Sequence, residues 1–197
     1  MVAFDLEVAR SKFCPEAFHR QPPLGDYGYN AHGGEGLMTS TLAESMKFTS
    51  VGESLRRHWL SHHIEINAGV SEAELEAFEE KFGVILPTDF REYFRCVNGM
   101  PTDVVDDGMI RFWMIEEIKP LTQGAPAYSA SSYVENSQSL FLFADYSMWA
   151  HAYAIRLASI PVQSNEVIII GYKSPVLISH SFSEFGHHYL TAKDLLH

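Results

Sequence analysis

A histidine pair is the first residue pattern in the sequence that could carry out chemistry. His58 and His62 are four residues apart, the spacing at which two imidazoles on one helix can bind the same zinc ion. Zinc hydrolases of the HExxH type carry a general-base glutamate directly after the first histidine, whereas this sequence has Trp59 there. His187 or His188 could supply a third ligand, but no motif brings them to the pair. We therefore expect no metal site and keep a metal-dependent hydrolase as the least favoured alternative.

An acidic run, Asp103-Val104-Val105-Asp106-Asp107-Gly108, is the second pattern. A calcium-binding loop needs an oxygen donor at its third position and a bidentate acid at its twelfth, but these positions are Val105 and Met114. We therefore interpret the run as a solvated turn. The sequence also lacks the glycine-rich loops that bind nucleotides and the serine or cysteine motifs of common hydrolases. These patterns predict a protein that is not an enzyme and that uses no cofactor or metal.

The composition is that of a folded protein with an excess of acidic residues. Of the 197 residues, 46% are hydrophobic and 13% are aromatic, which excludes wholesale disorder. The 25 acidic and 14 basic residues give a formal net charge of −11 at pH 7. This charge disfavours direct binding to nucleic acid or to anionic membranes and is compatible with a basic protein partner. No apolar run approaches about 20 residues, so we expect no transmembrane helix.

The N-terminal residues and the cysteines bear on localisation. The first seven residues show no basic segment followed by an apolar one, so no secretory signal is expected. Cys14 and Cys96 lie far apart and form no disulfide framework. We therefore expect a cytoplasmic protein, and the sequence leaves its oligomeric state open.

The elements that must position these residues begin after a long N-terminal extension, which we assign to residues 1–69. Residues 1–37 are rich in proline and glycine and read as a loop-rich segment that adds little to the core. Limited proteolysis is expected to remove them first. A helix is expected within residues 42–66, ahead of the domain itself.

Two helices open the domain that we assign to residues 70–197. Ser71 and Glu74 form a capping box at the start of a helix over 72–82, and the glycine that follows this helix suits its end. Pro87 occupies the first position of a second helix over 87–97 with an aromatic stripe.

The hydrophobic period changes from 3.6 to 2 near residue 100, which predicts a set of strands. A last helix is capped by Ser181 or Ser183. We therefore predict an α+β fold: a single domain with a mainly antiparallel sheet flanked by helices. The expected strands are 109–115, 140–144, 149–155, 167–172 and 176–179.

The run from Ser71 to Gly99 resembles the opening signature of the SUKH superfamily, a domain first known from a fungal cell-wall-synthesis regulator and abundant among bacterial immunity proteins. The resemblance covers about residues 70 to 192. In one place the sequence departs from it, because the turn after Asp145 usually carries a glycine. Its signature residues here are Phe82-Gly83, Leu86-Pro87, Tyr93-Phe94 and Val97-Asn98-Gly99, and the departing residues are Tyr146-Ser147-Met148.

The resemblance implies a binding protein rather than an enzyme. SUKH members of bacterial toxin systems bind a cognate toxin, often a nuclease, and block it. Nucleases are commonly basic, so an acidic inhibitor gains association rate by electrostatic steering. The leading hypothesis is a cytoplasmic immunity protein that binds a basic toxin domain. The alternative implied by the fungal branch is a regulatory scaffold that binds endogenous proteins.

The densest acidic stretch gives the candidate partner-binding residues. The aspartates between residues 103 and 107 have no basic residue near them in the sequence until Arg111. Two glutamates follow the next expected strand. Exposed tryptophans could anchor a partner inside such a charged rim. The alternative is that these acids only keep a loop solvated. The candidates are Asp103, Asp106, Asp107, Glu116, Glu117, Trp113 and Trp149.

Overall fold

The computed structural model describes residues 49–124, 136–171, 174–192 and 196. The expectation for residues 1–37, and the first part of the helix expected within 42–66, lie outside these residues. The elements in chain order are α1 (Val51–Ser61), α2 (Glu72–Phe82), α3 (Thr88–Cys96), β1 (Ile110–Phe112), β2 (Lys119–Pro120), β3 (Leu140–Tyr146), β4 (His151–Arg156), β5 (Val167–Ile170), β6 (Val176–Ser179) and α4 (Phe182–Thr191).

The strands form one antiparallel sheet in the order β1-β3-β4-β5-β6, and β2 also pairs with β3. β1 and β2 therefore lie end to end along one edge of β3, while β4 lies along its other edge. The predicted α+β fold with an antiparallel sheet is confirmed. The strands differ from their expected bounds mainly at the ends, because β1 is shorter than 109–115 and β2 was not expected.

The helix signals in the sequence place α2 accurately. Ser71 Oγ accepts from the backbone N–H of Glu74, whose carboxylate accepts from the backbone N–H of Ser71, so the capping box is present. Gly83 ends α2 in the left-handed conformation, with φ of 64°. Pro87 is the N-cap of α3 and not its first helical residue. Of the two candidate caps for α4, Ser181 is the one whose side chain accepts from Glu184.

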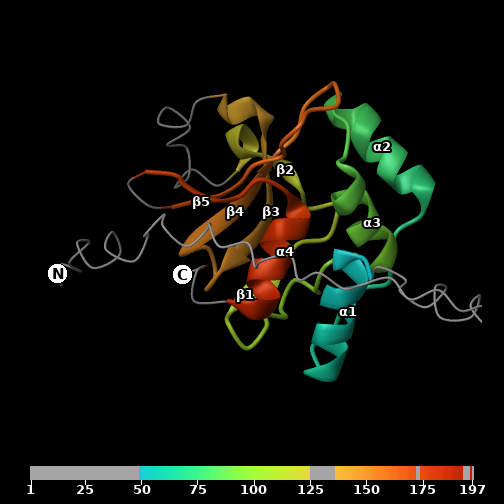
Figure 1. The fold of residues 1–197 in the computed structure, drawn as a ribbon, viewed down its shortest axis with the longest axis vertical. Coiled ribbons are helices and arrows are strands. Elements are labelled where there is room, and N and C mark those ends of the chain that lie inside the picture. The colour runs from blue at the N-terminus through green and yellow to red at the C-terminus, as the bar shows by residue number, and fades with distance from the viewer. Residues whose placement is uncertain (1–48, 125–135, 172–173, 193–195, 197) are drawn as a thin grey trace, which may run out of the picture. The chain divides into compact units, whose positions relative to one another are not determined.

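The helices pack onto the sheet through aromatic side chains. Figure 1 shows α4 lying across the sheet with α1 and α3 beside it. Phe143 of β3 contacts Phe90 of α3 and Phe185 of α4, with ring centroids 5.7 and 5.3 Å away. Two residues earlier on the same face of β3, Phe141 contacts Phe78 of α2 at 6.0 Å. One face of β3 therefore holds three helices in place.

α1 belongs to the same core as the sheet. Leu55 and Trp59 are fully buried, and Trp59 Nε1 donates a hydrogen bond to the hydroxyl of Tyr189 in α4 at 2.8 Å. The boundary expected at residue 70 therefore does not mark the edge of this core. In the described part of the chain, no helix has both the length and the apolar character needed to cross a membrane.

Candidate functional site

The structure divides the predicted acidic cluster into exposed and buried members. Asp103 and Asp107 are exposed, as expected. Asp106 is only 4% exposed, so its expected place on a charged rim is wrong. Its Oδ1 accepts from the backbone N–H of Ile110 at 2.7 Å, and its Oδ2 accepts from the hydroxyl of Tyr189. The buried carboxylate of Asp106 therefore connects the turn to β1 and to α4 through hydrogen bonds.

The two candidate tryptophans also have different environments. Trp113 is 2% exposed, so it is not the exposed anchor that we expected, and its Nε1 donates to Asp145 Oδ2 at 2.6 Å. Trp149 is 37% exposed, and its ring centroid lies 4.8 Å from that of Trp113. Trp113 therefore forms the buried floor on which the accessible ring of Trp149 rests.

The connection between β3 and β4 is a left-handed turn without glycine. Ser147, Met148 and Trp149 have φ angles of 48°, 52° and 74°, a region that costs non-glycine residues about 1–2 kcal/mol each. The strand expected to start at Trp149 therefore begins only at His151. The buried carboxylate of Asp145 stabilises the turn by accepting from the backbone N–H of Trp149 at 3.3 Å.

This turn presents apolar side chains beside the exposed acids. Met148 is 81% exposed, and Met109 is also exposed. The backbone N–H of Ser147 donates to the carbonyl of Met109 at 2.8 Å, which joins the turn to the acidic segment. Sequence reasoning missed both methionines, although each lies at or directly before the start of an expected strand. We name the exposed side chains of Asp103, Asp107, Met109, Met148 and Trp149 the turn face.

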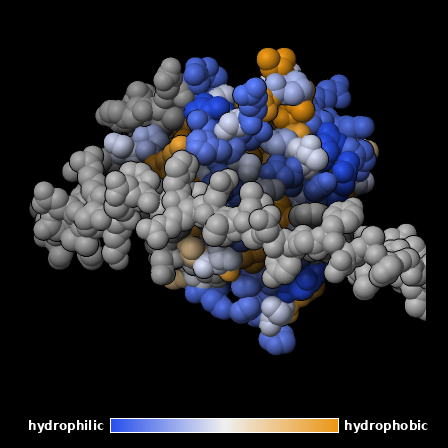
Figure 2. Space-filling view, viewed as in Figure 1, coloured by the Kyte–Doolittle hydropathy of each residue, from blue (hydrophilic) through white to orange (hydrophobic). Residues whose placement is uncertain are grey.

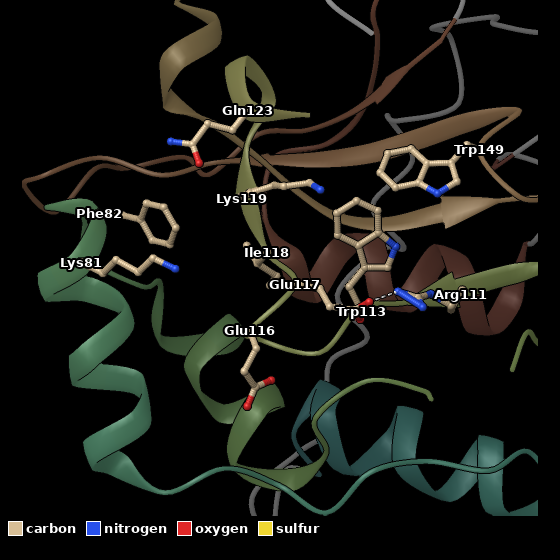
Figure 3. Close-up of a pocket in the computed structure, with 10 residues that line it drawn as sticks. All are labelled: Lys81, Phe82, Arg111, Trp113, Glu116, Glu117, Ile118, Lys119, Gln123 and Trp149. Carbon is tan, nitrogen blue, oxygen red and sulfur yellow. Dashed lines mark hydrogen bonds and ion pairs between the residues drawn. The ribbon is translucent and has the colours of Figure 1, made fainter. Parts of the chain in front are cut away.

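A pocket of about 340 Å³ lies beside Trp149 (Figure 3). Its walls come from the end of α2, from β1 and the segment after it, from β2 and from the β3–β4 turn. Glu117 was expected to extend the acidic patch, but its carboxylate pairs with Arg111 Nη2 at 2.6 Å and is thereby neutralised. The lining residues are Lys81, Phe82, Arg111, Trp113, Glu116, Glu117, Ile118, Lys119, Gln123 and Trp149.

The Asn98-Gly99 step at the end of α3 positions the floor of this pocket. Asn98 Oδ1 accepts from the backbone N–H of Ile115 at 2.8 Å, and its Nδ2 donates to the exposed Glu116 at 3.2 Å. Gly99 has φ of 62°, and a Cβ there would lie 2.4 Å from the carbonyl oxygen of Trp113. Only glycine allows this close approach. The step follows the C-cap Val97 of α3 and holds residues 113–116 in place.

The histidine pair forms no metal site in the described part of the chain. The rings of His58 and His62 are 4.2 Å apart between centroids, and His62 Nδ1 lies 2.8 Å from the carbonyl oxygen of His58. Within residues 49–124, 136–171, 174–192 and 196, no three histidine, cysteine or acidic side chains are grouped so as to hold an ion. The hydrolase alternative therefore has no ligand set there.

A second hollow of about 450 Å³ is apolar. Figure 2 shows hydrophobic residues gathered at the upper end of the view, where the β4–β5 connection meets the segment after α2. Ile85, Ile160 and Val162 line it and are exposed. Its carboxylate, Asp89, is engaged by the backbone N–H of Ser183 at 2.7 Å. This hollow therefore offers burial but little charge selectivity.

The comparison with known families matches the part of the chain that builds the turn face and the pocket. A model of the SMI1 / KNR4 family (SUKH-1) matches residues 69–186. The match begins just before the capped helix α2 and ends within α4. No curated protein matches the chain significantly.

Proposed function

Because the chain belongs to the SMI1 / KNR4 family (SUKH-1), we propose that it is a non-catalytic immunity protein that binds and neutralises a toxin in the cytoplasm. The family includes toxin immunity proteins, and its members bind partner proteins such as toxins. A free thiol at Cys96 is compatible with a reducing compartment.

The turn face is the observation that carries this proposal. Three consecutive non-glycine residues in the left-handed region are costly, and such conformations cluster at binding sites. The turn leaves Met148 and Trp149 exposed between the ends of β3 and β4, while Asp145 accepts from the backbone N–H of Trp149. Exposed methionine and tryptophan side chains are well suited to anchor a protein partner.

The charges around the turn face specify a basic partner. Asp103 and Asp107 are exposed in the segment before β1, which a backbone hydrogen bond from Ser147 to Met109 joins to the turn, and the whole chain carries −11. A toxin that handles nucleic acid needs basic residues to hold phosphates, so it would be steered to this face. Occlusion of that basic surface is sufficient for inhibition and requires no catalytic group.

A regulatory scaffold that binds endogenous proteins is the second candidate function, favoured by the fungal branch of the superfamily. The gene next to the one that encodes this protein distinguishes an immunity protein from a regulatory scaffold. An immunity protein is expected to be encoded next to a toxin gene, and co-expression should then restore growth of cells that produce the toxin. A scaffold would lack such a neighbour and would give no protection.

The decisive measurement is the association rate with that toxin. The double variant Asp103→Asn/Asp107→Asn should slow association about three- to tenfold at low ionic strength and flatten its salt dependence, with little change in dissociation. The control Glu76→Gln/Glu80→Gln removes the same charge from exposed positions on α2 and should change the rate less. Equal effects of the two double variants would contradict binding at the turn face.

A further inference from the structure

The pocket beside Trp149 differs in charge from the rest of the described surface. The part of the chain that the structure describes contains two lysines, Lys81 and Lys119, and both line this pocket. One comes from the end of α2 and the other from β2, and Figure 3 shows their ammonium groups at separate places, Lys119 beside the tryptophans and Lys81 beside Phe82. Two elements far apart in sequence therefore add positive charge to one hollow of an acidic protein.

The arginines show that these lysines are exceptional. Each of the six arginines in the described residues has a carboxylate within 4.0 Å, and these arginines are Arg56, Arg57, Arg91, Arg95, Arg111 and Arg156. Neither lysine has such a partner among the described residues. In a chain with 25 acidic residues, two ammonium groups in one pocket with no ion-pair partner among the described residues leave a binding site for an outside anion.

Aromatic rings surround these ammonium groups. Lys119 Nζ lies 5.6 Å from the ring centroid of Trp113 and 5.7 Å from that of Trp149. Lys81 Nζ lies 4.8 Å from the ring of Phe82. The rings stabilise the cations by cation–π interaction and leave their N–H donors available, while they exclude water from one side of the pocket.

We propose that this pocket binds the carboxylate of an aspartate or glutamate side chain from the protein partner. The carboxylate would accept from Lys119, whose ammonium group lies beside both tryptophans, and the aliphatic part of the partner's side chain would pack on Trp149. Lys81 would add positive charge on the other side of the hollow. This inference rests on the proposed function in that the partner is a protein. It adds the chemistry that the partner must present next to its basic surface.

The pocket favours a carboxylate over a phosphate group. Phosphate sites rely on arginine forks or on clusters of backbone N–H groups. Here the one guanidinium in the wall, Arg111, is taken by Glu117 at 2.6 Å and lies 3.7 Å from Asp145. The exposed carboxylate of Glu116 also lines the pocket and repels a dianion more strongly than a monoanion.

The turn face and the pocket meet at Trp149, which belongs to both. A partner that fits this arrangement has a basic patch over Asp103 and Asp107, an apolar contact at the turn, and one acidic side chain on the far side of Trp149. This alternation of charge discriminates between partners, because a uniformly basic surface would place a like charge on the two lysines.

The first test uses the full chain without any toxin. The probe is N-acetyl-glutamate methylamide, with the neutral glutamine analogue and inorganic phosphate as comparisons, and tryptophan fluorescence reports binding next to Trp149. We expect the glutamate probe to bind at millimolar concentration and the glutamine analogue to bind about tenfold more weakly. Lys119→Met should weaken glutamate binding about fivefold or more, and Lys81→Met, which removes a charge farther from Trp149, should weaken it less. Arg57→Met, which removes a positive charge from α1, should leave it unchanged.

The result that overturns the proposal is equal binding of the glutamate and glutamine probes, or tighter binding of phosphate. Unchanged affinity in both lysine variants, with melting temperatures that show intact folds, overturns it as well.

The second test separates this proposal from the proposed function. In complex with the toxin, Lys81→Met/Lys119→Met should raise the dissociation rate about tenfold and leave association unchanged or faster, because the variant is more acidic. The aspartate variants of the turn face change association instead. If the aspartate variants leave association unchanged while the lysine variant dissociates faster, the basic-toxin hypothesis alone is contradicted. An unchanged dissociation rate in the lysine variant would contradict the carboxylate pocket alone.

Discussion

At the scale of single residues, two buried aspartates hold the turn face in position. Asp145 accepts from the side chain of Trp113 and from the backbone of Trp149. Asp106 accepts from Ile110 and from Tyr189. Burial, together with the carboxylate of Asp106, raises the pKa of the Tyr189 hydroxyl, so this group remains a proton donor at physiological pH. Both carboxylates therefore act as structural acceptors that secure the loops carrying the exposed side chains.

Replacing Asp106 by asparagine tests this role. Asp106→Asn places an N–H₂ group against either the N–H of Ile110 or the hydroxyl of Tyr189, both of which are donors to the carboxylate. We expect the free energy of unfolding to fall by about 1–3 kcal/mol, measured by urea denaturation. The neighbouring Asp107→Asn has an exposed side chain and should change it by about 0.5 kcal/mol or less. Similar losses in both variants would argue against the buried network.

At the scale of elements, the β3–β4 turn adopts a backbone conformation that lowers stability and leaves Met148 and Trp149 exposed. β3 and β4 pair up to Tyr146 and His151, so the chain must reverse within four residues. Ser147, Met148 and Trp149 do so at positive φ without glycine. The cost of this conformation is offset by the hydrogen bonds from the turn to Asp145 and Met109.

A glycine at the first of these positions should relieve part of the strain. Ser147→Gly is expected to raise the free energy of unfolding by about 0.5–1 kcal/mol, because glycine adopts φ near 48° without a Cβ clash. Ser147→Ala retains the Cβ and should give no gain. Thermal unfolding of the two variants provides the comparison, and a gain of the same size in both would show that the backbone is not strained at this position.

At the scale of the whole molecule, α1 is part of the core that supports the sheet. It packs against α3 and α4, and the hydrogen bond from Trp59 to Tyr189 connects it to the network of Asp106. Trp59 also packs edge-on against Phe112 of β1, with ring centroids 4.9 Å apart. A segment outside the matched residues 69–186 therefore supports the strand that leads into the pocket.

Two leucines on α1 test this conclusion. Leu55 is fully buried, and Leu55→Ala should lower the free energy of unfolding by about 2–5 kcal/mol. Leu60 is exposed on the same helix, and Leu60→Ala should lower it by about 0.5 kcal/mol or less. If chemical denaturation gives equally small losses, α1 is not an integral part of the folded unit.

The sequence by itself determined the elements whose signals are local. The bounds of α2 follow from the Ser71–Glu74 capping box and from Gly83, because the hydrogen bonds that start and end a helix join residues a few positions apart. The antiparallel sheet follows from the period-two strands, and the signature between Ser71 and Gly99 identified the family. The exposure of Asp103, Asp107 and Trp149 also agreed with the sequence interpretation.

Only the tertiary structure decided which candidate residues are accessible. Asp106 is buried and accepts a hydrogen bond from Tyr189, which is 83 positions away. Trp113 is buried and donates one to Asp145, which is 32 positions away. The pocket likewise forms only when the end of α2 meets β2 and the β3–β4 turn, which places Lys81 and Lys119 in the wall of one hollow. Burial and charge pairing depend on contacts between distant segments, and these contacts leave no periodic or local trace in the sequence.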